Sequence, residues 1–381
     1  MSRIKLGVDR AIVDLVAPWD TLGDATAALT SCGLGEARLW VRPVHALSDG
    51  EAFRAKLACA VAEHTRGNVK APLICDEFCS MLHRRMARSI SFSLRKLATR
   101  RKLCFVLACC TADIIPDLQP DTIVRLEGGG SVAVEEPVVR PGKPASLRRR
   151  VSIGLGRKAD YAPFSSMHYR ATDELGFVDK VFVMREGRGG CPLGIVVYSH
   201  GPLELALRNQ ATGGWFSRNP RRVNKHLRIL RRLVIHPDVR GCGLGHYLVK
   251  KTLPRVGTDH VECLATMGAF NPVFERAGME KIGQYDPPAG AKTALSKLKM
   301  LGVDPGTREF VAHVARRPRV RKIVASVVFD WYAATTAGGE RRVARQSPVF
   351  LAQTFRSLVG NGPVYYLWRK KRTNNTHKRC A

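Results

Sequence analysis

Residues 240 to 245 are Arg240-Gly241-Cys242-Gly243-Leu244-Gly245, a glycine-rich stretch between two apolar segments. The run from Leu230 to Pro237 predicts a strand, and the run from His246 to Val256 predicts a helix. Glycines at such a turn let backbone N–H groups approach phosphate oxygens, and the helix N-terminus adds partial positive charge. Because Arg240 adds a formal charge, the turn predicts a site for the pyrophosphate of a phosphorylated cofactor.

The spacing of the glycines distinguishes among phosphate-binding motifs. A dinucleotide fingerprint, G-x-G-x-x-G, needs a third glycine at position 246, where the chain has His246. Glu262 stands about where a dinucleotide-binding fold has its ribose-binding acid, so spacing alone does not exclude that alternative. A P-loop is excluded, because no Lys-Ser or Lys-Thr pair follows these glycines.

The stretch Val234-Ile235-His236-Pro237-x-x-Arg240-Gly241-x-Gly243-Leu244-Gly245 resembles motif A of the GCN5-related N-acetyltransferases, whose pattern is Arg/Gln-x-x-Gly-x-Gly/Ala. The run from His260 to Gly268 predicts the next strand. The helix that follows begins near Asn271 and ends at Gly278, which is similar to the family's next helix. Upstream, two more predicted strands, 180–186 and 193–200, are joined by a glycine-rich turn. The resemblance covers about residues 160 to 286.

This resemblance implies an α/β fold with a mixed central sheet and flanking helices. It also implies that acetyl-CoA, or another acyl-CoA, lies where two central strands part. The backbone of Leu233, Val234 and Ile235 would pair with the pantetheine arm and polarise the thioester carbonyl. The loop from Arg240 to Gly245 would hold the pyrophosphate, and Asn271 would contact the pantetheine. A neutral amine would then attack the thioester directly.

Three residues are candidates for catalysis. Many members of the family protonate the departing thiolate with a Tyr, but the matching residue here is Phe274. Glu262 could accept the proton of the attacking ammonium, and the alternative is an ordinary strand acid that faces solvent. His168 and Tyr169 precede the first strands, where the family's substrate-binding helices lie. They form either a catalytic or a structural pair.

Two motifs stand in the first 130 residues. Leu47-Ser48-Asp49-Gly50-Glu51 precedes a helical run, and the apolar run from Pro72 to Cys75 ends in Asp76-Glu77. In this order they resemble the signature motif and the Walker B strand of ABC-type ATPases, and Leu103 to Cys110 predicts a further strand. The resemblance implies a signature loop containing Ser48, Gly50 and Glu51. It also implies Asp76 near Mg²⁺ and Glu77 orienting the attacking water.

This ATPase-like module lacks an essential part. The chain contains no G-x-x-x-x-G-K-[ST], and only residues 1 to 46 precede the signature motif. Without the Lys and backbone cradle that hold the β- and γ-phosphates, we expect neither ATP/Mg²⁺ binding nor hydrolysis by this chain alone. Three explanations stay open: a truncated start, a relic, or a loop that acts on ATP bound to another subunit in a dimer or partner chain.

The charge of the chain indicates an anionic partner. Its 381 residues include 62 Lys and Arg against 32 Asp and Glu, which gives a formal net charge of +30. Because basic clusters recur along the chain and aromatic residues lie near several of them, we expect nucleic acid, or a protein bound to it, as a partner. The alternative is a solvated basic surface. The clusters lie at 140–158, 218–232, 316–322 and 369–379, and the aromatic residues are Trp215, Phe216, Trp331, Tyr332, Tyr365, Tyr366 and Trp368.

The 11 cysteines predict no metal site, because no C-x-x-C pair occurs. Several stand in apolar runs and are expected to be buried as small hydrophobic side chains. No apolar segment reaches transmembrane length and no signal peptide follows the start, so we expect a chain of the reducing cytoplasm that does not enter membranes.

Composition divides the chain into four parts. We expect an ATPase-like module at 1–130, a basic linker at 131–159, an acyltransferase domain at 160–286 and a basic helical extension at 287–381. The function expected is CoA-dependent N-acyl transfer to an amine on nucleic acid or on a protein bound to it. Three alternatives remain: a non-catalytic nucleic-acid-binding protein that keeps both scaffolds, a DNA-base modification like that of the phage Mom-type proteins, and an ATPase completed by a partner chain.

Overall fold

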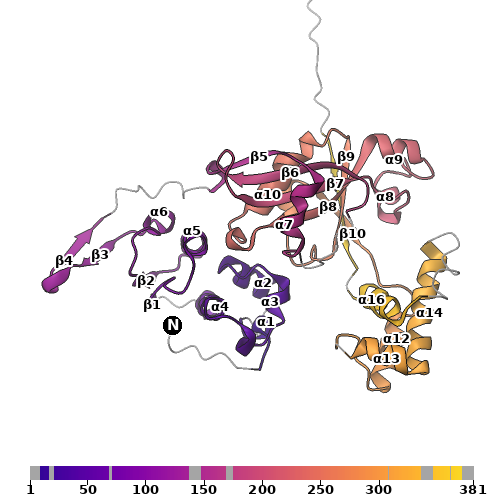
Figure 1. Ribbon diagram of the computed structural model, residues 1–381, viewed down its shortest axis with the longest axis horizontal. Coiled ribbons are helices and arrows are strands. Elements are labelled where there is room, and N and C mark those ends of the chain that lie inside the picture. Colours follow the sequence, from indigo (N-terminus) through magenta and orange to yellow (C-terminus); the bar gives the residue numbers. More distant parts are fainter. Residues whose placement is uncertain are drawn as a thin grey trace, which may run out of the picture. The chain divides into compact units, whose positions relative to one another are not determined.

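The computed structural model describes residues 9–16, 21–67, 71–136, 147–168, 175–307, 309–335, 346–360 and 362–370. These residues form a mixed α/β fold with one seven-stranded sheet and two two-stranded sheets (Figure 1). They fall into two compact units: the second holds residues 264–269 and 281–366, and the first holds the remainder. The mixed α/β class that we expected from the sequence is therefore confirmed.

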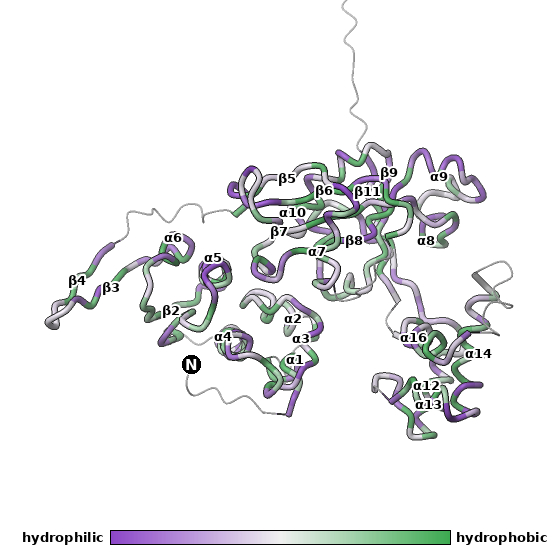
Figure 2. The backbone as a smooth tube through the Cα atoms, viewed as in Figure 1, coloured by the Kyte–Doolittle hydropathy of each residue, from purple (hydrophilic) through white to green (hydrophobic). Residues whose placement is uncertain are grey.

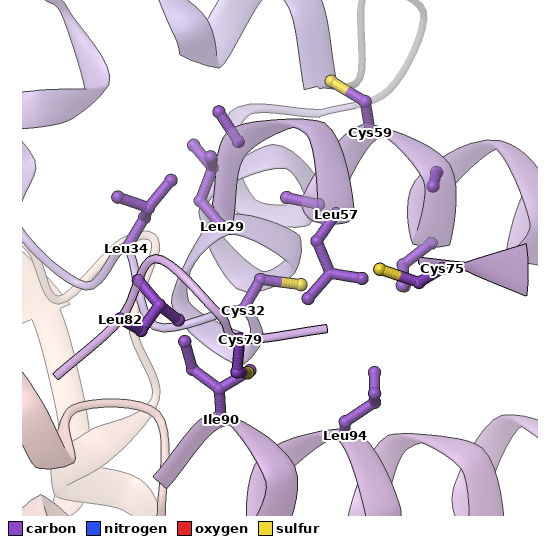
Figure 3. Close-up of a cluster of buried hydrophobic side chains, with 14 of the residues drawn as sticks. Leu29, Cys32, Leu34, Leu57, Cys59, Cys75, Cys79, Leu82, Ile90 and Leu94 are labelled. Atoms are coloured by element: carbon purple, nitrogen blue, oxygen red, sulfur yellow. The ribbon is translucent and has the colours of Figure 1, made fainter. Parts of the chain in front are cut away.

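The N-terminal helices pack around one apolar core. Figure 3 shows Cys32, Cys75 and Cys79 among the leucines of this core. These thiols are buried and pack as small hydrophobic side chains, as expected, whereas Cys109 and Cys110 are exposed. The helices are α1 (Ile12–Val16), α2 (Leu22–Ser31), α3 (Ala37–Trp40), η1 (Val44–Ala46) and α4 (Asp49–Gly67).

Two short strands, β1 (Leu73–Cys75) and β2 (Phe105–Leu107), pair in parallel, and α5 (Arg84–Arg101) connects them. Both strands were predicted, although β2 is shorter than the apolar run that indicated it. The register partners Ile74 and Val106 are exposed over 61% and 52% of their surfaces. In the part of the chain that the structure describes, one face of this small sheet is therefore uncovered.

A buried carboxylate connects α5 with the chain that leads into the large sheet. Asp117 lies in α6 (Ile115–Leu118) and is 2% exposed. It accepts hydrogen bonds from Arg88 of α5 at 2.8 Å and from Arg150 at 2.7 Å. The antiparallel hairpin of β3 (Ile123–Leu126) and β4 (Val132–Glu135), with η2 (Gly128–Gly130) at its turn, stands between these segments in sequence.

The seven-stranded sheet has the order β10-β11-β9-β8-β7-β6-β5. Neighbours from β5 to β8 are antiparallel, whereas β8 and β9 are parallel. The middle of β6 and nearly all of β7 are buried, as expected for central strands. The strands are β5 (Val151–Gly156), β6 (Val178–Glu186), β7 (Pro192–Ser199), β8 (Leu227–Ile235), β9 (His260–Ala265), β10 (Glu280–Gln284) and β11 (Val364–Arg369).

The two parallel strands part after three residue pairs. β8 pairs with β9 only from Leu227 to Ile229, and the last partner on β9 is Glu262. From Leu230 to Ile235, β8 pairs with β7, and the shift in register between these strands leaves Arg231 as an extra residue. An extra residue bends a strand and increases its twist. The bulge at Arg231 thus accounts for the strands parting here.

Helices in the first unit pack on this sheet and at its ends. The one that follows the glycine-rich turn, α10 (Leu244–Thr252), packs against β7, β8 and α11 (Val273–Ala277). The other helical elements are η3 (Leu147–Arg149), η4 (Lys158–Tyr161), α7 (Ala162–Ser165), α8 (Ala206–Ala211), α9 (Pro220–His226), η5 (Pro237–Val239) and η6 (Leu253–Arg255).

The second unit contains a helical core of its own. Phe310 and Phe355 are fully buried with ring centroids 5.9 Å apart, and Val324 and Leu298 complete the centre of this core. Figure 2 shows hydrophobic and hydrophilic stretches alternating along these helices. They are α12 (Ala291–Met300), α13 (Phe310–Arg316), α14 (Pro318–Thr335) and α16 (Pro348–Val359).

The structure differs from the expected division in two places. The segment 131–159, expected as a linker, contains β4 and β5. Val151, Ile153 and Leu155 alternate with small residues, a strand pattern that the neighbouring arginines obscure. The segment 287–381 is helical from α12 to α16 as expected, but β11 within it is a strand of the large sheet. No helix among the described residues is both long and apolar enough to span a membrane.

Candidate functional site

The glycine-rich turn connects β8 to α10 through two left-handed residues. Gly241 has φ 82° and Gly243, the N-cap of α10, has φ 81°. Side chains with a Cβ rarely adopt this conformation, so both positions require glycine. The first N–H groups of α10 have no partners within the helix and stand at the turn. The predicted strand–turn–helix is confirmed.

Arg240 is held by backbone carbonyls from three segments. Its Nε donates to the carbonyl of Ile235 at 2.8 Å, its Nη2 to that of Met167 at 2.7 Å and its Nη1 to that of Gly35 at 3.5 Å. Glu36 lies 3.8 Å from the same Nη1. Burial lowers the pKa of this guanidinium, and the neighbouring Glu36 opposes that effect. Arg240 therefore fixes the end of β8, whereas the sequence had indicated a phosphate contact.

The parted strands leave backbone groups of β8 without a partner in β9. Leu233, Val234 and Ile235 pair with Val196, Ile195 and Gly194 of β7 on one side only. In an antiparallel pair, alternate residues direct their N–H and C=O groups away from the partner strand. Part of this stretch can therefore form hydrogen bonds with an extended ligand, as an added strand would.

The start of α11 lies against the start of α10. A Cβ on Gly245 would come within 3.3 Å of Val273 Cγ2. Asn271, two residues earlier, is exposed and precedes the N-cap Pro272. The structure therefore brings Asn271 to the same end of α10 as the glycine-rich turn.

Four cations, from η3, α5, α11 and α10 itself, lie near His246 in the first turn of α10. Arg148 of η3 contacts His246 with 2.7 Å between Nη2 and Nε2, and Lys96 of α5 has its Nζ 3.6 Å from where a Cβ on Gly243 would stand. Arg276 of α11 and Lys250 of α10 add further positive charge. In the described part of the chain, no carboxylate forms an ion pair with these four cations. We call Lys96, Arg148, Lys250 and Arg276 the turn cations.

The positive charge of the turn cations contributes to lowering the pKa of His246 and of Lys96. Burial, followed by Arg148 and the other three cations, lowers the pKa of His246 to about 4. Burial, followed by Arg100 and then by Arg148 and Arg276, lowers the pKa of Lys96, although Cys242 partly opposes the shift. The imidazole is thus neutral near pH 7, and the site favours an anion.

One side of the turn packs against the N-terminal helices. The carbonyl oxygen of Thr30, in α2, is so close to Gly241 that a Cβ there would lie 2.2 Å from it. Cys242 is buried with its Sγ 3.5 Å from Ser93 Oγ and 3.6 Å from the carbonyl of Ser89, both in α5. The N-terminal helices thereby form one wall of the turn.

Glu262 is fully buried in an ion pair. Its carboxylate oxygens accept hydrogen bonds from Nε and Nη2 of Arg208, each at 3.0 Å, and Arg208 is also fully buried. Nη2 and Nη1 of Arg208 also donate to the carbonyls of Pro202 and Leu203, at 2.7 and 2.9 Å. The alternative of an acid facing solvent is therefore wrong. A general base must be able to reach the proton that it accepts. Both carboxylate oxygens of Glu262 already bind the guanidinium of Arg208, so this geometry does not favour Glu262 as the base.

The other two catalytic candidates lie after α7. His168 is half-buried, and its N–H donates to the carbonyl of Ser165 at 3.3 Å. Because Arg240 binds the carbonyl of Met167, the segment carrying His168 is attached to the glycine-rich turn. Tyr169 lies outside the described residues. Phe274, which stands where a general acid would be expected, is buried in α11.

The ATPase-like motifs form a helix cap and an exposed acidic turn. Ser48 and Glu51 make reciprocal bonds at the start of α4, since Ser48 N–H donates to Glu51 and Glu51 N–H to Ser48 Oγ. A Cβ on Gly50 would lie 2.9 Å from Leu82. Asp76 and Glu77 are exposed after β1, where the Glu77 N–H donates to Asp76 Oδ1 at 2.9 Å. These hydrogen bonds explain how Ser48, Glu51, Asp76 and Glu77 are held in place without a bound nucleotide.

The sequence did not indicate the turn cations or the partner of Glu262. Arg148 belongs to the basic cluster expected as a linker, and Lys96 lies on α5, in the segment expected to be an ATPase-like module. Neither carries a local pattern that points to the glycine-rich turn, whose first residue, Arg240, is 144 residues beyond Lys96. Only the basic cluster at residues 140–158 indicated that the segment expected as a linker would contact an anion.

No family model, no curated protein and no solved structure matches the chain.

Proposed function

We propose that the protein is a CoA-dependent N-acyltransferase of the GCN5-related type, whose first unit binds acetyl-CoA or another acyl-CoA at the glycine-rich turn. The observation that carries this proposal is the combination at one place of two left-handed glycines, parted parallel strands and four cations that pair with no carboxylate of the described residues. These features match the parts of an acyl-CoA: phosphates for the cations and turn, and an extended amide chain for the free edge of β8.

Each group of residues has a defined task in this proposal. The backbone N–H groups from Gly241 to Gly245 and the turn cations would hold the phosphates. The backbone of β8 from Leu233 to the N–H of Ile235 would bind the pantetheine amides and orient the thioester, since the Ile235 carbonyl already accepts from Arg240. Acyl-CoA supplies an activated carbonyl, which a neutral amine attacks, with the CoA thiolate as leaving group.

The proton acceptor in this proposal is not Glu262, because Arg208 occupies both of its oxygens. His168 is the candidate that the contacts favour, since Arg240 holds its segment at the turn. The high positive charge supports an acceptor amine on nucleic acid or on a protein bound to it.

Calorimetry with acetyl-CoA tests the proposal on matched glycine variants. We expect Gly243→Glu to weaken binding about 10- to 1000-fold, because a carboxylate would stand beside the phosphates. Gly129→Glu is the control, since Gly129 also has a positive φ of 77° but stands at the hairpin turn with open space around it. No binding by the unaltered protein, or equal binding by Gly243→Glu and Gly129→Glu, would reject the proposal.

A specific observation supports one other function, a nucleic-acid-binding protein that keeps this fold without catalysis. Arg240 binds three backbone carbonyls and lies beside Glu36, and Thr30 and Ser93 occupy one side of the turn. If this function is correct, the protein binds nucleic acid, fails to bind acetyl-CoA and leaves labelled acetyl-CoA unchanged in the presence of nucleic acid and amines. Mass analysis of that mixture separates the two functions.

A further inference from the structure

The chain makes a long excursion between β7 and β8 that contains α8 and α9. At its tip, Trp215 is exposed over 39% of its surface, whereas the adjacent Phe216 is fully buried with its ring centroid 4.6 Å away. The guanidinium of Arg222 lies 5.0 Å from the indole centroid and donates to the Trp215 carbonyl at 2.6 Å. The ring of His226 lies 5.3 Å away. The indole is therefore held in place while part of it faces solvent.

Exposed cations follow this indole closely in the sequence, one before α9 and two on it. Arg218, Arg221 and Lys225 are exposed, and no described carboxylate forms an ion pair with any of them. Figure 2 shows α9 in the hydrophilic colour. Asp259, which pairs with His226, also accepts a hydrogen bond at its backbone carbonyl from the Lys370 N–H, at 2.8 Å. We call Arg218, Arg221, Lys225 and Trp215 the α9 surface.

The carboxylates near this surface are already bound. Glu204 accepts hydrogen bonds from the Arg218 N–H at 2.5 Å and from Asn209 at 2.8 Å. Asp259 binds His226 Nδ1 at 2.7 Å, and Glu280 binds Arg369. The side chains of the three α9-surface cations are therefore left to attract an external anion.

The α9 surface is connected to the place where β8 and β9 part. Phe216, beneath Trp215, lies 6.0 Å from the guanidinium of Arg208. Arg208 in turn binds Glu262, the last residue of β9 that pairs with β8. Burial of these three side chains makes the connection rigid, so a ligand on the α9 surface is bound beside the same part of the sheet.

We propose that the α9 surface binds single-stranded nucleic acid, with Trp215 stacking on a base and Arg218, Arg221 and Lys225 contacting phosphates. A fixed, exposed aromatic ring close to cations that pair with no described carboxylate suits a strand whose bases are accessible, whereas a duplex hides its base faces. The inference rests on the proposed function only in assigning the bound strand as the carrier of the acceptor amine. Binding of the strand itself needs no acyl-CoA.

The helical unit provides a control that has charge without an aromatic ring. Residues 316–322, Arg-Arg-Pro-Arg-Val-Arg-Lys, join α13 to α14 and carry five exposed cations. If nucleic acid were attracted by net charge alone, removing three cations here would weaken binding as much as removing three from the α9 surface. The matched variants are Arg218→Gln/Arg221→Gln/Lys225→Gln and Arg316→Gln/Arg319→Gln/Lys322→Gln.

The test measures binding of a fluorescent 15-nucleotide single-stranded DNA to the full chain by anisotropy at several salt concentrations, without acyl-CoA. We expect Trp215→Ala to weaken binding about 5- to 150-fold, and Trp215→Phe to stay within about threefold, because a Phe ring still stacks. The α9 triple variant should lower the slope of log Kd against log salt by about 2, whereas the control triple should leave it unchanged.

Several outcomes would overturn the proposal. They are equal effects of the two triple variants, no effect of Trp215→Ala in a protein with native circular dichroism, and equal competition by duplex DNA or by polyglutamate. If Trp215→Ala does not fold, binding by Trp215→Phe and by the α9 triple variant still tests the proposal. Calorimetry with acetyl-CoA on the same samples keeps the two proposals apart, because loss of strand binding with acetyl-CoA binding intact rejects only this one.

Discussion

At the scale of single residues, the buried pair of Arg208 and Glu262 is highly sensitive to substitution. Two opposite charges with no exposed surface stabilise each other through two hydrogen bonds of 3.0 Å, and neither can be solvated if its partner is removed. The carbonyls of Pro202 and Leu203 accept two further hydrogen bonds from Arg208. The pair therefore fixes the loop after β7 to the end of the paired part of β9.

We expect Glu262→Ala to lower the free energy of unfolding by about 3–5 kcal/mol, since it leaves a buried guanidinium without its carboxylate. The double variant Arg208→Met/Glu262→Leu should recover most of that loss, because it removes both charges and keeps the volume. Urea denaturation measures both. A loss below about 1 kcal/mol in Glu262→Ala would contradict a structural role and return Glu262 to the catalytic candidates.

At the scale of elements, the site is made by the start of α10 and by three segments that meet it. η3 brings Arg148, α5 brings Lys96 and α11 brings Arg276. After η5, the left-handed glycines let the chain enter α10. Each of the three segments thus adds positive charge around the glycines.

This arrangement predicts a pH dependence of acetyl-CoA binding. His246 has a pKa of about 4 in the folded protein, below the 6.5 of an unfolded chain, so the unfolded state binds more protons between these values. Folding stability from this group therefore falls as the pH decreases from 6.5 toward 4. Bound phosphates would oppose Arg148, Arg276, Lys96 and Lys250, raise the pKa of His246 and favour proton uptake.

Acetyl-CoA affinity should accordingly rise as the pH is lowered from 6.5 to 5, by at most about tenfold per pH unit for one proton. Titration calorimetry in buffers of different ionisation enthalpy measures the proton uptake. His246→Gln is the control, because its amide does not titrate, and any dependence that it retains belongs to the ligand's own phosphates. Equal proton uptake by the two proteins would show that His246 does not face the phosphates.

At the scale of the whole molecule, the chain combines a first unit containing the site with a helical unit that has a separate core. The strands β9, β10 and β11 belong partly to each unit. The helices between β10 and β11 are held together by buried side chains from α13, α14 and α16, among which Phe310 and Phe355 are fully buried. Each unit thus has enough buried apolar surface of its own to unfold as a separate step.

We expect Phe355→Ala to destabilise the helical unit by about 3–5 kcal/mol, because a buried ring is replaced by a cavity next to Phe310. Hydrogen exchange should then show faster exchange in α13, α14 and α16, with protection in β6 and β7 unchanged. Phe329→Ala in α14 is the control, since Phe329 is 38% exposed. Uniformly faster exchange in both units would show that they unfold together.

Local patterns in the sequence determined the order of strands and helices around the turn, the requirement for glycine at Gly241 and Gly243, and the helices after residue 287. These features depend on periodicity and on backbone angles, which neighbouring residues set. Only the tertiary structure decided the tasks of the charged residues. Arg240 binds carbonyls, Glu262 is buried, and Lys96 reaches the turn from a distant helix. Such roles depend on partners far away in the chain, for which the local sequence carries no signal. The local sequence also carries no signal for the position of β11. This strand lies between β9 and β10 in the sheet, although the helices α12 to α16 separate it from both strands in the chain.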